Sequence, residues 1–118
     1  MKYIKLVQLI VLSFVLGVPA DGNADPKIED IGEAAYMRGC VACHDEDGAG
    51  AMPGIPDLRG DDGPLKKSDT VLLSSIMKGL ETEGSAMPMP PKGGDDSLSE
   101  SEALMIIRYM RHVFGARP

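Results

Sequence analysis

The sequence predicts an all-α fold, with three or more helices and two long loops. Apolar residues recur at helical spacing in three separate segments. Two stretches, residues 45–64 and 84–97, are rich in glycine and proline and therefore favour irregular loops. No segment shows the alternation of apolar and polar residues that is typical of a half-buried strand. The chain has 118 residues, so we expect one folded domain at most.

The first predicted helix covers residues 29–39 and ends next to Cys40. Its apolar positions, spaced by three or four, are Ile28, Ile31, Ala35 and Tyr36. The second helix is expected to begin after Ser68, because serine is a preferred N-cap residue. The apolar positions of this second helix are Val71, Leu72, Ile76 and Leu80.

The last predicted helix follows Ser99, which forms a capping box with Glu102. Leu98 is placed to pack against Ala103 across this helix start. One apolar stripe is expected along the helix, at Ala103, Ile106, Ile107, Met110, Val113 and Phe114. A glycine and a proline after the stripe, at positions 115 and 118, predict its end.

Residues 1–24 are expected to be a signal peptide, and residues 25–118 the folded domain. Two lysines among the first five residues give a basic start. The apolar run of residues 6–18 is shorter than the roughly 20 residues that a spanning helix needs. Ala20 and Ala24 mark two possible cleavage sites. We therefore predict an exported protein with no stable membrane span after cleavage; the alternative is an uncleaved anchor.

Composition restricts both the core and the partners. After the leader the chain has only three aromatic residues, Tyr36, Tyr109 and Phe114, and no tryptophan. Long structureless loops in a small domain usually have a function, and a large apolar cofactor would explain both features. The formal net charge of −6 argues against nucleic acid as a partner, because nucleic-acid-binding proteins are usually basic.

The two cysteines of the chain stand in the sequence Cys40-Val41-Ala42-Cys43-His44. Cys-x-x-Cys-His is the attachment motif of c-type haem: two thiols form thioethers to the haem, and the adjacent imidazole binds the iron. A thioredoxin-like redox pair would need a βαβ surround, which the sequence lacks. A zinc site would need four ligands, and the only other histidine is His112, which we expect on the helix surface.

A second iron ligand is expected among the methionines, because methionine ligation raises the reduction potential and suits electron transfer. Methionines on apolar helical faces are usually core residues, which applies to Met77, Met105 and Met110. Met52 follows the haem motif too closely to reach the opposite haem face. The stretch 87–91, Met-Pro-Met-Pro-Pro, is stiffened by its prolines and leaves two candidates, Met87 and Met89.

From about residue 28 to residue 115 the chain resembles the class I cytochrome c family, in particular its small bacterial periplasmic members with one haem. In that family a glycine and an aromatic residue precede the motif at intervals of four, as Gly32, Tyr36 and Cys40 do here. These residues pack against an aliphatic and an aromatic residue three apart on the last helix. Ile106 and Tyr109 match that pair.

The resemblance also implies the ligand set. Family members carry the methionine ligand in a Met-Pro-Pro segment, which favours Met89 over Met87. A proline carbonyl accepts a hydrogen bond from the proximal imidazole, here His44, and Pro56 is the match, with Pro53 possible. The implied site residues are therefore Cys40, Cys43, His44, Met89 and Pro56, around one covalently attached haem c whose iron is bound by His44 and Met89.

The implied function is electron transport in a periplasmic redox chain, by a monomer that exchanges electrons with redox partner proteins and is not itself an enzyme. The alternative is a haem c subunit of a dehydrogenase or oxidase complex. A third class, a catalytic or gas-sensing haem, would need an open iron position, which a methionine ligand removes. The sequence does not separate the free carrier from the subunit.

Overall fold

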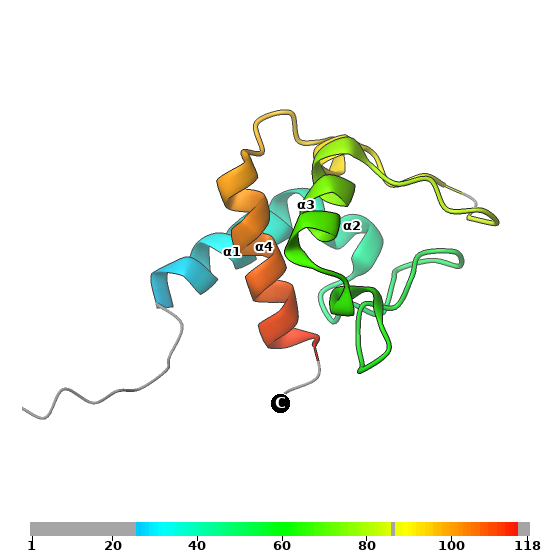
Figure 1. The fold of residues 1–118 in the computed structure, drawn as a ribbon, viewed down its shortest axis with the longest axis horizontal. Helices are drawn as coiled ribbons and strands as arrows, with labels where there is room; N and C mark the ends of the chain where they lie inside the picture. The colour runs from blue at the N-terminus through cyan, green and yellow to red at the C-terminus, as the bar shows by residue number, and fades with distance from the viewer. Residues whose placement is uncertain (1–25, 86, 116–118) are drawn as a thin grey trace, which may run out of the picture.

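The computed structural model describes residues 26–85 and 87–115, and this part of the chain is helical (Figure 1). Its elements are α1 (Pro26–Gly39), α2 (Val41–His44), the 3-10 turn η1 (Pro64–Lys66), α3 (Asp69–Lys78), the 3-10 turn η2 (Pro91–Gly94) and α4 (Glu100–Val113). Strand-like pairing among these residues is confined to one isolated bridge, between Leu80 and Met89. The all-α prediction is confirmed.

The expected leader, residues 1–24, lies outside the described residues, and so does Pro118. Within the described part, no helix has both the length and the apolar composition needed to cross a membrane.

Helices α1 and α3 form where the sequence predicts them, with shifted ends. Helix α1 begins at Pro26, three residues before the expected start, because proline is well tolerated in a first turn. Ser68 caps α3 as predicted, and its hydroxyl accepts a hydrogen bond from the amide of Val71 at 3.4 Å. The helix ends at Lys78 and does not reach Leu80. The reason is Gly79, whose φ of 80° terminates the helical hydrogen-bond pattern.

The predicted start of α4 is confirmed, and its apolar stripe is corrected at one position. Ser99 and Glu102 form both bonds of the capping box, and Leu98 and Ala103 are buried in one cluster. Val113 was expected in the stripe, but its side chain is 50% exposed. Tyr109 takes the place on the buried face instead, so the face turned toward α1 includes an aromatic residue that the aliphatic pattern left out.

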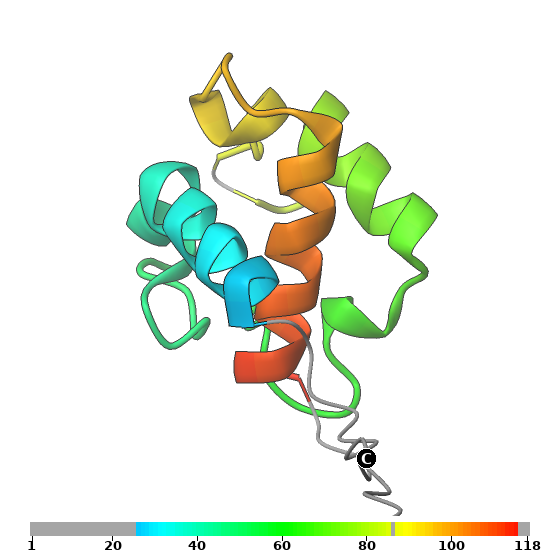
Figure 2. The same ribbon diagram turned by 90° about the vertical axis from the view of Figure 1, so that its left-hand side faces the viewer.

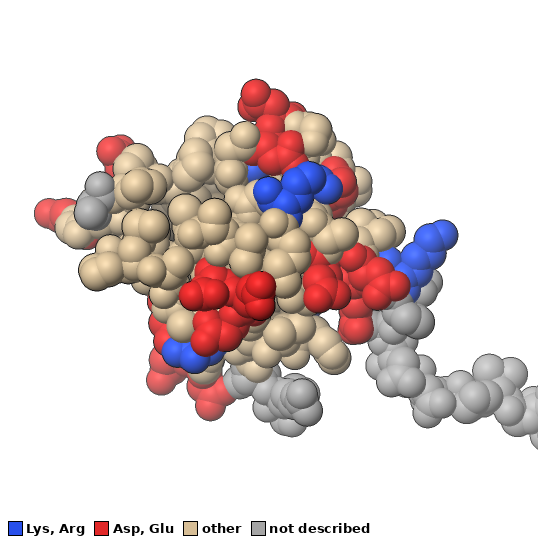
Figure 3. Space-filling view, turned by 180° about the vertical axis from the view of Figure 1, so that it is seen from behind, with Lys and Arg blue, Asp and Glu red and all other residues tan. Residues whose placement is uncertain are grey.

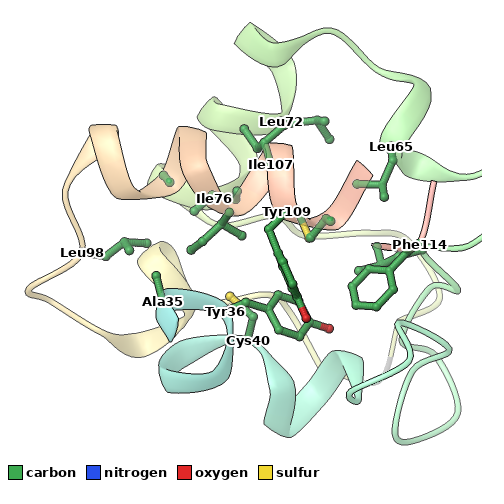
Figure 4. Close-up of a cluster of buried hydrophobic side chains, with 14 residues drawn as sticks. Ala35, Tyr36, Cys40, Leu65, Leu72, Ile76, Leu98, Ile107, Tyr109 and Phe114 are labelled. Carbon is green, nitrogen blue, oxygen red and sulfur yellow. The ribbon is translucent and has the colours of Figure 1, made fainter. Parts of the chain in front are cut away.

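Helices α1 and α4 cross in close contact at Gly32 (Figure 2). A Cβ atom at this position would overlap the backbone carbonyl oxygen of Met105 and would lie 2.9 Å from Cβ of Tyr109. Beside the crossing, Tyr36 lies 5.5 Å from both Tyr109 and Phe114, measured between ring centroids (Figure 4). The pairing of α1 and α4 that the resemblance implied is therefore present, with Ile106 fully buried.

The core lies between α1, α3 and α4, with contributions from the loops (Figure 4). Its buried members are Ala35, Tyr36, Cys40, Leu58, Leu65, Leu72, Ile76, Leu98, Ala103, Ile106, Ile107, Tyr109, Met110 and Phe114. Two apolar positions expected in the second helix stay out of it: Val71, which lies in α3, is 47% exposed, and Leu80, which lies beyond its end, is 41% exposed. Cys40 stands at the edge of this core, where α1 passes into α2, and so connects the packed helices to the site described next.

Candidate functional site: a pocket beside the Cys-x-x-Cys-His motif

The Cys-x-x-Cys-His motif continues directly from α1 into the short helix α2. The amide of Cys40 donates to the carbonyl oxygen of Tyr36 at 2.8 Å, so the helical bonding of α1 extends to the first cysteine. The amide of His44 donates in turn to the carbonyl oxygen of Cys40 at 3.0 Å. The first cysteine and the histidine are thus one helical turn apart, as neighbours on one face.

The end of α2 is fixed by the aromatic cluster of the core. The phenol of Tyr36 donates a 2.6 Å hydrogen bond to the backbone carbonyl oxygen of Asp45, the residue after His44. Asp45 itself has a φ of 67°, and its amide donates to the carbonyl oxygen of Val41 at 2.8 Å. Consequently the backbone that carries the histidine is held by α1, and also by the loop that follows, whose Gly50 amide donates to the carbonyl oxygen of His44 at 3.0 Å.

Both cysteine thiols are free. Cys40 is buried, and burial raises the pKa of its thiol to about 11. A thiol–disulfide exchange site needs the opposite, a thiol with a lowered pKa. The described residues also hold no βαβ unit around the motif. The thioredoxin-like alternative therefore has no support in this structure.

His44 is half-buried, and its Nδ1 atom is completely buried without a hydrogen-bond partner. Burial lowers the pKa of the imidazole, so the ring is neutral at neutral pH, which is the form that binds a metal ion. Pro56 lies on the same pocket, but its carbonyl oxygen does not accept a bond from this nitrogen in the structure. The expected bond from His44 to Pro56 stays a prediction.

One pocket brings all five predicted site residues together. It has a volume of about 270 Å³, and its walls come from the α1–α2 junction and from three later segments. The lining residues are Gly39, Cys40, Cys43, His44, Gly54, Ile55, Pro56, Pro64, Lys67, Leu80, Thr82, Ser85, Met87, Pro88, Met89, Pro90 and Gly93. Met52 and Pro53 do not line it. Among the described residues, the lining contains no carboxylate, and Lys67 is its only lysine or arginine.

Met89 is the better fixed of the two candidate methionines. Its amide donates to the carbonyl oxygen of Leu80 at 2.8 Å, and the amide of Leu80 donates back to the carbonyl oxygen of Met89 at 3.0 Å. Met87 also lines the pocket, but it is 50% exposed, and its carbonyl oxygen accepts a bond from the hydroxyl of Ser85. The backbone of Met89 is therefore tied to the end of α3, and that of Met87 to its own loop.

The sequence predicts Leu80 inside the second helix and gives no sign of this pairing with Met89. Gly79 was the available signal, because a glycine commonly follows the end of a helix. A Cβ atom at Gly79 would lie 2.6 Å from the carbonyl oxygen of Met89, so the close approach of the two chain segments depends on this glycine.

A second anchor joins the methionine loop to α1. Arg38 forms ion pairs with Asp95 at 2.6 Å and with Glu102 at 3.2 Å, and so connects α1 to the loop end and to α4. Hydrogen bonds from Ser97 and then from Arg38 lower the pKa of Asp95 to about 2. The same loop also contacts α1 at Gly93. A Cβ atom added to Gly93 would lie 2.5 Å from the carbonyl oxygen of Gly39.

The residues at this pocket suit a haem better than a lone metal ion. No group of three or more His, Cys, Asp or Glu residues within residues 26–85 and 87–115 could hold a metal. The side chain of His112 is 61% exposed and lies 3.7 Å from Glu29, on the helix surface as expected. What the pocket does offer is two thiols, a neutral imidazole with an unpartnered buried nitrogen, and walls that are mainly apolar.

A helical fold with a pocket beside this motif defines a c-type cytochrome domain. Residues 28–110 match the family described as cytochrome c oxidase, cbb3-type, subunit III, and the chain belongs to this family. Its cofactor is haem c, which is covalently bound, and its role is electron transport.

Two relatives give the comparison more detail. The chain is 29% identical over 89 residues to the cytochrome c subunit of a quinone alcohol dehydrogenase from Gluconobacter oxydans. This match covers 71% of the chain but only 18% of the relative. The crystal structure of cytochrome CL from the marine methylotroph Methylophaga aminisulfidivorans superposes with a TM-score of 0.59 at 25% identity. That superposition covers 77% of this chain and 56% of cytochrome CL.

Proposed function

We propose that the chain carries one haem c in this pocket and acts as an electron carrier without substrate chemistry of its own. In this proposal Cys40 and Cys43 form the two thioether bonds, and His44 and Met89 are the axial ligands of the iron. The observation that supports it most is the position of Met89, which lines the same pocket as the motif although it lies 45 positions after His44 in sequence.

The haem supplies a one-electron couple at its iron. The residues of the chain determine its attachment, its ligands and its reduction potential. The thioethers keep the cofactor attached in an exported protein. The neutral imidazole of His44 is available as a ligand without loss of a proton. A thioether sulfur from Met89 favours the reduced iron and raises the potential. The carbonyl oxygen of Pro56 is proposed to accept a hydrogen bond from Nδ1–H of His44 in the haem-bound protein, which would fix the ring orientation.

We place the mature domain, residues 25–118, in the periplasm after removal of a leader, as a monomer that diffuses between redox partners. The second candidate is a haem subunit of a larger dehydrogenase or oxidase, which the named relatives favour. A free carrier elutes from a sizing column at its monomer mass after gentle extraction. A subunit elutes together with its enzyme, and the reducing substrate of that enzyme reduces its haem.

The assignment of the axial methionine is tested by two matched variants. Met89→Ala should lower the reduction potential and abolish the weak near-infrared band that sulfur coordination gives to ferric haem. Met87→Ala, a change of the same side chain on the same loop, should leave both unchanged. The double variant detects rescue of Met89→Ala by Met87. Retention of the band in Met89→Ala together with its loss in Met87→Ala would reverse the assignment.

A further inference from the structure

We propose that the ammonium group of Lys67 pairs with a propionate carboxylate of the haem. The inference rests on the proposed occupation of the pocket by haem, and it assigns a role to a residue that the cysteine-histidine motif does not include.

The chemistry of the cofactor creates the need for a cation. A haem carries two carboxylates on one edge of an otherwise apolar ring. A carboxylate held against apolar walls loses hydration, and this loss is costly unless a charge or hydrogen bonds compensate it. The pocket offers little compensation elsewhere, because its other polar side chains are hydroxyls, thiols and a neutral imidazole.

The backbone of Lys67 is held in place from two directions. Its amide donates to the carbonyl oxygen of Pro64 at 3.2 Å, which closes the η1 turn. Its carbonyl oxygen accepts a 2.7 Å bond from the guanidinium of Arg111 on α4. The same guanidinium donates to the carbonyl oxygen of Leu65 at 3.1 Å and pairs with the carboxylate of Asp69. Arg111 thus fixes this pocket wall to the packed core.

The side chain of Lys67 has no carboxylate within ion-pair distance among the described residues, whereas its neighbour Lys66 pairs with Asp62 at 3.1 Å. Other cations near the pocket are already engaged. Arg38 pairs with two carboxylates, and the ammonium of Lys92 donates to the carbonyl oxygen of Asp96. Lys67 is therefore the cation that both lines the pocket and lacks a carboxylate partner in this part of the chain.

The overall charge of the chain is acidic, so the surroundings of the pocket favour no anion. Acidic side chains gather in several groups on the face shown in Figure 3, and the chain has 18 acidic against 12 basic residues. An uncompensated propionate in this acidic field stabilises the ferric state, because ferric haem carries one more positive charge than ferrous haem. Removal of the Lys67 charge should therefore lower the reduction potential.

The experiment compares Lys67→Ala with Lys66→Ala in the haem-loaded protein. Both variants remove one positive charge, at adjacent positions, but only Lys67 is among the residues that line the pocket. Two properties are measured: the midpoint potential, and the frequency of the propionate bending mode in the resonance Raman spectrum. Lys67→Ala should lower the potential and shift the propionate mode, Lys66→Ala should leave the mode at its wild-type frequency, and Lys67→Arg should restore both.

A propionate mode that is unchanged in Lys67→Ala overturns the proposal, even if the potential falls, because a long-range charge effect moves the potential alone. Equal shifts of the mode in Lys66→Ala and Lys67→Ala overturn it as well. Failure of the proposed ligation is seen separately, as absence of the near-infrared sulfur band from the wild-type protein.

Discussion

At the α1–α4 crossing, protein side chains fill the interior, whereas at the pocket they leave a cavity of about 270 Å³. In the crossing, Gly32 lets two helix backbones touch, and three aromatic rings pack within 6 Å of one another. The pocket walls are irregular segments that are held by a few specific bonds, such as the two between Leu80 and Met89. One region is stabilised mainly by close packing of side chains, and the other is shaped to receive a cofactor.

Residues of the crossing and residues of the pocket therefore differ in what they determine, and a stability measurement alone would not distinguish them. Residues of the crossing should affect the folding of the whole domain. Residues of the pocket should affect haem attachment, ligation and potential first. Each prediction below changes residues of one region, or of the junction between the two, and measures either haem attachment and ligation or the stability of the fold.

The largest effect is expected from the cysteines. Cys40→Ala or Cys43→Ala removes one thioether, and stable haem incorporation should be weakened or abolished. Mass spectrometry of the denatured chain should show one added haem in the wild type and a bare chain in most of the variant protein. Ala42→Ser, an exposed change between the two cysteines, is the control and should keep the haem. A wild-type chain without added haem, made in cells that attach haem c, would contradict the haem assignment itself.

Gly32→Ala should give the next largest effect, because the new methyl group would overlap the backbone of α4. Overpacking typically costs about 1–3 kcal/mol, and we expect the free energy of unfolding to fall by an amount near the upper end of this range. Gly39→Ala, in the same helix, is the matched control: its nearest atoms would lie at 3.6 Å, an ordinary contact. Thermal unfolding of both variants checks this. Equal melting temperatures for the two would show that the crossing tolerates a wider spacing.

The crossing could be predicted from the sequence because its signals are local and periodic. The capping box of Ser99 and Glu102, the cap at Ser68 and the spacing of the buried residues on α1 and α4 all depend on neighbours within a few positions. The same reasoning fails at Val113. Its hydrophobicity predicts a buried position in the stripe, but its side chain is exposed, and Tyr109 completes the buried face of α4 instead.

The pocket could be predicted only where a chemical motif marks it. The Cys-x-x-Cys-His sequence and the Met-Pro-Pro segment named its residues, but no periodic signal brings residue 80 beside residue 89, or Arg111 to a carbonyl group 46 positions earlier. Lys67 likewise has no sequence feature that distinguishes it from Lys66. These placements follow from long-range backbone contacts, which a single sequence does not encode in any local pattern.

A smaller and more localised effect is expected at Gly79. A methyl group there would lie 2.6 Å from the carbonyl oxygen of Met89, and the backbone conformation of Gly79, with φ 80° and ψ 172°, costs a non-glycine residue about 1–3 kcal/mol. Gly79→Ala should therefore displace Met89, weaken the near-infrared band and lower the potential. Gly84→Ala has nearly the same φ, 82°, with no atom within 4 Å, so it carries the backbone strain alone. If both variants keep a wild-type band, Met89 does not depend on the contact with Gly79.

The smallest effect is expected where the two regions are joined, at the ion pair of Arg38 with Asp95. The pKa of Asp95 is about 2 in the folded protein, against an ordinary value of 3.8, because Ser97 and then Arg38 hydrogen-bond to its carboxylate. A carboxyl group with a lowered folded-state pKa stabilises the protein above its unfolded pKa, and this contribution is lost as the pH falls through the folded value. The ion pair is partly exposed, with the side chain of Arg38 44% and that of Asp95 19% exposed, so solvent screens it and the effect on stability should be small.

Asp95→Asn should therefore melt below the wild type at neutral pH, and the gap between the two melting temperatures should close as the pH falls from about 4 to about 2. Asp62→Asn is the control, because the side chain of Asp62 is fully exposed and pairs only with Lys66 in the neighbouring turn. A constant gap from pH 7 to pH 2 would mean that the charge of Asp95 does not contribute. A gap that closes, with an unchanged near-infrared band, would show that this ion pair stabilises the junction of the two regions without setting the ligand of the haem.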